Sequence, residues 1–195
     1  HAIVGLNVKY DPLHKVTIIP RGMSLGSTMF LPEKDRVSIS RSFLLDELVI
    51  SMGGRVAEEL FLPDICTGAR QDLAQATKLA HAMVCEWGMS EELGPRTFGH
   101  NEELVFLGRE VNRTQDYSEA TALRIDEEVT KILSTAHDKA HAVLEANRDA
   151  VDKLVVELLE KETVTGADAE DIVKHGRVRS PEERGDATPP PPLPA

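Results

Sequence analysis

The chain has few aromatic residues and no cluster of basic residues, and each shortage excludes a class of protein. Aromatic side chains make up only 4% of the 195 residues; strand-rich sandwiches use many of them, so the composition favours packed helices. The net charge is -11 and the Lys and Arg residues are dispersed, which argues against a nucleic-acid partner because phosphate binding needs clustered positive charge. We therefore predict a mainly α protein that binds no nucleic acid.

Cysteine pairs and long apolar runs are absent as well. Cys66 and Cys85 form no C-x-x-C pair, so the sequence indicates neither a disulfide framework nor a zinc knuckle, and it suits a reducing compartment. No apolar run reaches the roughly 18 residues that cross a bilayer, and no signal peptide is visible. We expect the chain itself to be soluble. The sequence also lacks the glycine-rich motifs that cradle nucleotides and the G-x-S-x-G elbow of serine hydrolases.

Apolar residues at helical spacing predict helices over most of the chain. The first long helix starts near Ser40 and contains Gly53 and Gly54, which destabilise a helix interior unless another element packs closely there. A second helix covers 69–87, with an apolar stripe along one face. The stripe consists of Leu73, Ala76, Ala80, Met83 and Trp87.

The C-terminal half repeats the same pattern. Apolar residues recur at helical spacing over 125–143 and again over 151–158, which predicts at least two helices, packed as a helical hairpin or bent end to end. The hairpin is expected to run from Tyr117 to about Glu162. A short capped helix follows in "TGADAEDIVKHG".

Short strands are expected only near the N-terminus. Residues 1–8 resemble the last turns of a helix, because Asp11 and Pro12 disfavour helix beyond them. The stretches "KVTIIP" and "STMFLP" flank a glycine-containing turn and predict a small β-hairpin.

The domain boundary is expected at residue 175. Residues 1–175 form the predicted folded domain, and 176–195 form a disordered, proline-rich tail. Six of the eleven prolines lie in "SPEERGDATPPPPLPA", a composition that cannot build a core.

Two residues are candidates for chemistry before any family is considered. His1 lies at a helix terminus, where most histidines are structurally ordinary. Asp72 lies in the first turn of its helix, where the helix dipole alone would favour a carboxylate. Asp72 also lies beside the buried stripe, and a carboxylate directed inward requires a partner, for which a cation would serve.

A second histidine pair is the weaker candidate. His137 and His141 in "HDKAH" lie one helical turn apart, with Asp138 in place of the glutamate of H-E-x-x-H. Histidines at this spacing are common on solvated helix faces, and Asp is a methylene shorter than Glu. We favour the solvated face.

Three motifs together carry a family resemblance. "KVTIIPRG", "GGRVAEE" and "TGARQDLAQATKLAHAMVCEWGMSEELGP" occur in order, and from His1 to about Lys174 the chain resembles the protease domain of the FtsH family. These are membrane-anchored, ATP-dependent zinc metalloproteases of the AAA+ class. In this family H-E-A-G-H is followed at once by A-I or A-V, so His1 resembles the second histidine of H-E-x-x-H.

The resemblance implies a zinc site. His1 and Asp72 would be metal ligands, with Asp72 as the Asp of T-G-x-x-x-D. The residues expected before His1 are His-Glu-x-x, which would supply another ligand and the glutamate that activates water. Because this histidine and this glutamate both lie outside the sequence, the chain alone is expected to have no catalytic residue and to be inactive.

The resemblance implies further roles with less force. Glu58 in "GGRVAEE" would orient a histidine ligand, although a surface glutamate is an equal alternative. Gly26, Ser27 and Thr28 would line the edge strand on which the family lays an extended substrate; an ordinary hairpin strand is the alternative. Gly53 and Gly54 would allow close packing against the helix of His1.

The resemblance also implies partners. The parent protein would be a homohexamer that uses Zn²⁺ and ATP, with its membrane anchor and ATPase module upstream. Its peptidase domain would lie on the cytoplasmic side of a membrane, expected to be the bacterial inner membrane, and would degrade membrane proteins and short-lived soluble proteins. The alternative is a non-catalytic helical module that supports assembly or binds partners.

Overall fold

The computed structural model describes residues 1–20, 22, 25–32, 36–99 and 117–185. The chain divides into two units: the first consists of His1 and 36–143, and the second of 2–35 and 144–195. Each unit is described by itself.

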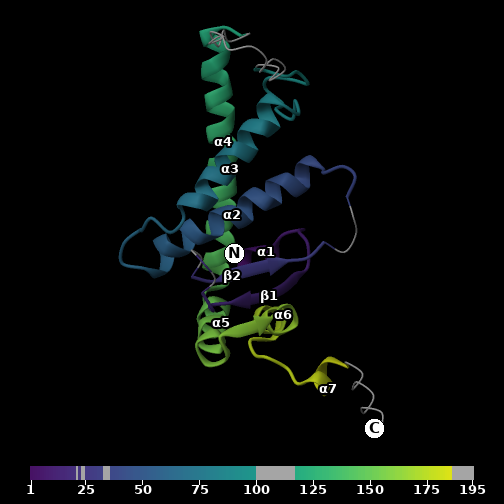
Figure 1. Ribbon diagram of the computed structural model, residues 1–195, viewed down its shortest axis with the longest axis vertical. Coiled ribbons are helices and arrows are strands. Elements are labelled where there is room, and N and C mark those ends of the chain that lie inside the picture. The colour runs from purple at the N-terminus through teal and green to yellow at the C-terminus, as the bar shows by residue number, and fades with distance from the viewer. Residues whose placement is uncertain (21, 23–24, 33–35, 100–116, 186–195) are drawn as a thin grey trace. The chain divides into compact units, whose positions relative to one another are not determined.

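Three long helices form the first unit (Figure 1): α2 (Arg41–Phe61), α3 (Arg70–Cys85) and α4 (Glu119–Ala146), of which residues up to 143 belong to it. Ser40 begins α2, since its hydroxyl accepts a hydrogen bond from the Phe43 N–H at 3.3 Å and so satisfies one of the first free amides. Helices α2 and α3 pack against each other. Their fully buried side chains include Leu48, Val56, Ala76, Ala80 and Met83.

Helix α4 is tied to the rest of this unit by buried carboxylates. Glu128 accepts a hydrogen bond from the Ser90 hydroxyl at 2.7 Å, which lowers the pKa of Glu128 despite its burial. Asp46 on α2 accepts one from Lys139 at 2.6 Å. Because buried carboxylates are costly without partners, these pairs fix where α4 contacts the unit.

A three-stranded antiparallel sheet lies in the second unit. It contains β1 (Leu13–Thr17), β2 (Ser27–Phe30) and β3 (Thr163–Thr165) in the order β2-β1-β3. Val16 pairs with Thr28 on one side and Val164 on the other. Residues from both ends of the chain therefore share one sheet, and β2 is an edge strand of it.

Four helices complete the second unit: α1 (Ala2–Asn7), α5 (Arg148–Lys161), α6 (Gly166–His175) and α7 (Pro181–Arg184). Helix α6 packs on α1, α5 and β1. Its first residue, Gly166, lies so close to β1 that an added Cβ would be 1.7 Å from the carbonyl oxygen of Leu13. The sheet and α6 thus meet through backbone, without a side chain between them.

The mainly α fold class and the β-hairpin are confirmed. Helices α2, α3 and α6 lie where the apolar pattern predicts them, and Asn147 alone separates α4 from α5. Trp87, expected on the buried stripe of α3, is instead 48% exposed, because α3 ends at Cys85. Among the described residues, no helix is both long and apolar enough to span a membrane.

The ordered part of the chain extends beyond the expected boundary at residue 175. Ser180 caps α7 in a complete capping box, and Gly185 ends that helix. A Ser cap, Pro at the first turn and Glu three residues after the cap stabilise even a helix as short as α7. The division into a folded domain and a disordered tail stays a prediction. Residues 186–195 of the predicted tail lie outside the described part of the chain.

Candidate functional site

His1 and Asp72 lie side by side, although 71 positions separate them in the sequence. His1 precedes α1, and Asp72 lies in the first turn of α3. The Nε2 atom of His1 is 3.2 Å from Oδ2 of Asp72, and the side chains are 32% and 41% exposed. The structure therefore brings together the two predicted metal ligands at a half-buried position that solvent can reach.

A backbone carbonyl fixes the orientation of the His1 ring. Nδ1 of His1 lies 2.8 Å from the carbonyl oxygen of Ile50 on α2. A carbonyl only accepts hydrogen bonds, so Nδ1 carries a proton and donates it. In a neutral ring Nε2 would then present its lone pair to Asp72, which is the arrangement that metal-binding histidines use.

The pair needs a positive charge between its two facing atoms. A neutral Nε2 and a carboxylate oxygen are both acceptors, and two acceptors 3.2 Å apart repel each other unless a proton or a metal cation lies between them. The hydrogen bond with Asp72 accordingly raises the pKa of His1, although burial of the ring opposes the shift. A proton on Nε2 would fill the place that a divalent cation could take, and the donor set, one imidazole and one carboxylate, suits zinc.

The candidate metal site is incomplete within the described part of the chain. No group of three or more His, Cys, Asp or Glu residues there is arranged to hold a metal ion. His1 and Asp72 provide two ligands, and a catalytic zinc site typically has three protein ligands. The observed geometry fits zinc on the condition that another ligand comes from elsewhere in the full-length protein.

Glu58 does not hydrogen-bond His1. Its carboxylate accepts hydrogen bonds from the Cys66 N–H at 3.2 Å, the Cys66 thiol at 2.8 Å and Arg55 at 3.0 Å. The bonds from Cys66 and the charge of Arg55 lower the pKa of Glu58. Glu58 therefore holds the middle of the loop that connects α2 to α3, the helix that carries Asp72.

Gly26, Ser27 and Thr28 lie at the start of the edge strand of the second unit. Ser27 and Thr28 belong to β2 and pair with Thr17 and Val16 of β1. Gly26 precedes the strand, and an added Cβ there would lie 2.7 Å from the carbonyl oxygen of Thr17. The structure therefore places Ser27 and Thr28 on the edge strand β2 and Gly26 directly before it, as expected for a hairpin.

His137, the first histidine of "HDKAH", faces carboxylate side chains. Nε2 of His137 lies 2.9 Å from Oε2 of Glu59, and Nδ1 lies 3.6 Å from Asp138. Both ring nitrogens of His137 thus face carboxylates at a half-exposed position, which suits the solvated helix face rather than a zinc site.

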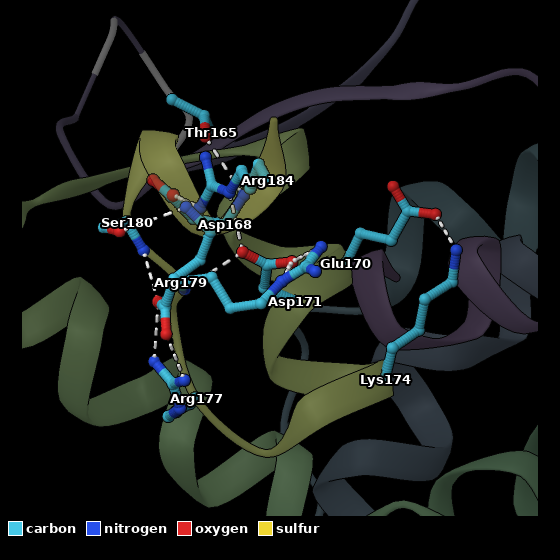
Figure 2. A network of polar contacts seen from close by, with 10 residues as sticks. Thr165, Asp168, Glu170, Asp171, Lys174, Arg177, Arg179, Ser180 and Arg184 are labelled. Atoms are coloured by element: carbon cyan, nitrogen blue, oxygen red, sulfur yellow. Dashed lines mark hydrogen bonds and ion pairs between the residues drawn. The ribbon is translucent and has the colours of Figure 1, made fainter. Parts of the chain in front are cut away.

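A second cluster of charges, which the sequence analysis missed, lies between α6 and the segment after it (Figure 2). Asp171 accepts hydrogen bonds from the backbone N–H of Arg179 at 3.0 Å and from the side chains of Arg179 and Arg184 at 2.8 and 2.7 Å. Arg184 also pairs with Asp168. Burial would raise the pKa of Asp171, but these donors outweigh it and hold the pKa well below its usual range.

The same cluster continues into α7. Arg177 donates two hydrogen bonds to Glu183, at 3.0 and 2.6 Å, and the Ser180 N–H donates a third at 2.9 Å. These donors, Arg177 first, lower the pKa of Glu183 to about 2. We call the set Asp168, Asp171, Arg177, Arg179, Glu183 and Arg184 the C-terminal clamp. Its carboxylates are saturated by partners within the chain, so it fastens α7 to α6.

Known proteins similar to this chain agree on one family. Peptidase family M41 matches residues 1–172. A protein of Slackia heliotrinireducens named ATP-dependent zinc metalloprotease FtsH is 51% identical over 176 residues, which are 90% of this chain and 22% of that protein. Proteins of the same name from Kosmotoga olearia and Akkermansia muciniphila are 51% and 45% identical, over 89% and 98% of this chain and 27% and 24% of their own lengths.

The matches cover the chain but only part of each relative. The chain spans about a quarter of the length of the curated relatives it matches. The family match includes both His1 and Asp72 and ends within α6, and it confirms the resemblance drawn from the three motifs. The chain belongs to peptidase family M41.

Proposed function

We propose that this chain is the peptidase domain of an ATP-dependent zinc endopeptidase and that His1 and Asp72 are two of its zinc ligands. The observation that carries the proposal is the pair itself: a histidine nitrogen directed at a carboxylate oxygen 3.2 Å away, with the other ring nitrogen bound to a backbone carbonyl. The names of the relatives, each an ATP-dependent zinc metalloprotease, support the choice of metal.

Each residue of the site has a definable task in peptide hydrolysis. When bound, zinc supplies Lewis-acid chemistry that lowers the pKa of water to about 7 and polarises a scissile carbonyl. The Ile50 carbonyl keeps the Nδ1 proton of His1 in place, so that Nε2 stays free to bind metal. Asp72 supplies the negative charge that favours a divalent cation over a proton. A histidine and the glutamate base would come from residues before His1.

Glu58 would support the site from a distance. Through Cys66 it holds the loop that leads into α3, and the position of α3 decides where Asp72 lies. Besides the expected role of orienting a histidine ligand, which stays a prediction, Glu58 would have an indirect role, in which it positions the carboxylate ligand.

The edge strand β2 is proposed as the site for an extended substrate. Within the described residues β2 pairs with β1 alone, so a substrate backbone adding to its other edge would gain hydrogen bonds without demanding particular side chains. Gly26, Ser27 and Thr28 would form the first part of that edge.

The wider assembly is proposed from the family resemblance. We propose a homohexamer with an ATPase module and a membrane anchor, whose peptidase domains face the cytoplasm at a bacterial inner membrane and degrade membrane proteins and short-lived soluble proteins. The net charge of -11 supports protein substrates rather than nucleic acid.

The test begins with the coding sequence before His1. We expect His-Glu-x-x there, and we expect the purified full-length protein to degrade an unfolded substrate such as casein in the presence of ATP and zinc. Removal of zinc by a chelator should abolish degradation, and added zinc should restore it. If both upstream residues are substituted and no degradation occurs, the chain is instead a non-catalytic assembly module with this fold.

A further inference from the structure

At Gly54, helix α2 presents backbone rather than a side chain to the His1–Asp72 pair. At Gly54, an added Cβ would lie 2.8 Å from Nε2 of His1, 3.2 Å from Cε1 of the same ring and 3.5 Å from Oδ2 of Asp72. Real Cβ atoms do not approach a ring nitrogen as closely as 2.8 Å. Gly54 is thus the residue whose missing side chain leaves room for the two facing atoms.

The same turn of α2 also holds the other side of the ring. The carbonyl oxygen that accepts the Nδ1 proton belongs to Ile50, one helical turn before Gly54. In an α-helix, residues four apart lie on one face. The imidazole is therefore held at Nδ1 by Ile50 and lies against bare Cα at Gly54.

The position of a glycine here needs an explanation, because glycine weakens a helix interior relative to alanine. Gly54 lies inside the 21-residue helix α2, with more than one turn of helix after it. A substitution by alanine would strengthen the helix locally. The benefit of glycine must therefore come from the absence of a side chain, which would otherwise contact His1 and Asp72.

We propose that Gly54 is a positioning residue of the metal site. Its bare backbone allows Nε2 of His1 and Oδ2 of Asp72 to converge on one cation while Nδ1 stays bound to Ile50. A methyl group at residue 54 would force the ring to turn away, because the ring cannot keep the Ile50 hydrogen bond and also clear the new side chain. This proposal rests on the proposed zinc site and adds to it the element that shapes the site.

The metal-free protein should tolerate the same methyl group. Without metal, the His1 side chain is held by one carbonyl and one carboxylate, and it is 32% exposed, so the ring can rotate toward solvent at small cost. With metal, rotation would remove a ligand. The substitution should therefore separate metal binding from folding.

The experiment compares full-length wild-type protein with its Gly54→Ala variant. Zinc affinity is measured by competition with a chromophoric chelator, and thermal unfolding is measured on protein stripped of metal. We expect Gly54→Ala to bind zinc at least about tenfold more weakly, as when a ligand-orienting partner is lost, while the metal-free Tm stays equal or rises because alanine favours helix.

Ser51→Ala is the matched control on the same helix. The Ser51 hydroxyl donates to the Glu47 carbonyl oxygen at 3.0 Å, within its own helix, so this variant should bind zinc as the wild type does. The proposal is overturned if Gly54→Ala binds zinc within about threefold of wild type, or if its metal-free Tm falls, since glycine would then serve helix packing. Failure of the wild type itself to bind zinc would refute the proposed function together with this inference.

Discussion

Asp72 and Asp171 are both paired aspartates, but their surroundings differ. Asp171 has a 4% exposed side chain and accepts hydrogen bonds from one backbone N–H and two arginine side chains. Asp72 is 41% exposed and, among the described residues, faces His1. A carboxylate saturated by its own chain stabilises the fold, whereas one that is left with unused acceptor capacity can bind an ion. The comparison separates the structural cluster from the candidate site.

Substitution of Asp171 should give the largest loss of stability. In Asp171→Ala, Arg179 and Arg184 lose their shared partner, and the Arg184 side chain is only 14% exposed, so its charge would be left poorly compensated. We expect Tm to fall by several degrees, measured by circular dichroism. Zinc affinity should not change. An unchanged Tm would show that the clamp contributes nothing to the fold.

Two truncations should divide the C-terminal segment into an essential and a dispensable part. A chain that ends after residue 179 loses Glu183 and Arg184 and with them the contacts of α7, so its Tm should fall, though less than in Asp171→Ala because Arg179 still pairs with Asp171. A chain that ends after Gly185 keeps the whole clamp and should unfold like the wild type. Equal Tm values for the two truncations would contradict this division.

Acid should weaken the clamp progressively. The pKa values of Asp171 and Glu183 are lowered in the folded state, that of Glu183 to about 2. A lowered folded-state pKa gives stability that is fully present above the unfolded-state value, about 4, and is lost as pH falls through the folded-state value. The Tm difference between wild type and Asp171→Asn should therefore be largest above pH 5 and narrow toward pH 2. A difference independent of pH would argue against the charge pairing.

Substitution of Asp72 should have the smallest effect on the metal-free fold. Because the Asp72 side chain is 41% exposed, its pair with His1 is screened by water and should contribute less than about 1 kcal/mol. We expect Asp72→Asn to unfold within that margin of the wild type in chelator, as measured by urea denaturation. A larger loss would make Asp72 a structural residue like Asp171.

The sequence predicts local structure better than long-range pairing. Apolar periodicity locates α2 and α3, because a helix that packs one face on a core repeats every three to four residues. Strand β3 has only three residues, and its partner β1 lies about 150 residues away, so no local pattern reveals it. Helix α7 begins with a full capping box at Ser180. The proline-rich composition of the residues that follow predicts disorder for the whole segment, so the helix is not predicted.

At the candidate site, too, some features can be predicted from the sequence and others depend on the fold. Motif resemblance predicts that His1 and Asp72 act together, and the structure places their side chains in contact. The Ile50 carbonyl could not be predicted, because every residue has a carbonyl and only the fold decides which one meets a histidine. The link from Glu58 to Cys66 likewise depends on a loop conformation rather than on a spacing.

The most direct test of the metal site is the zinc content of the full-length protein and of its Asp72→Ala variant, determined by mass spectrometry of metals after dialysis. The wild type should retain one zinc per chain. The variant should lose its zinc. Loss of a residue that only orients a ligand typically lowers metal affinity by roughly 10- to 100-fold, and loss of the ligand Asp72 itself should lower the zinc affinity further. Equal zinc content in the two proteins, with both folded, would show that Asp72 is not a ligand and would contradict the account.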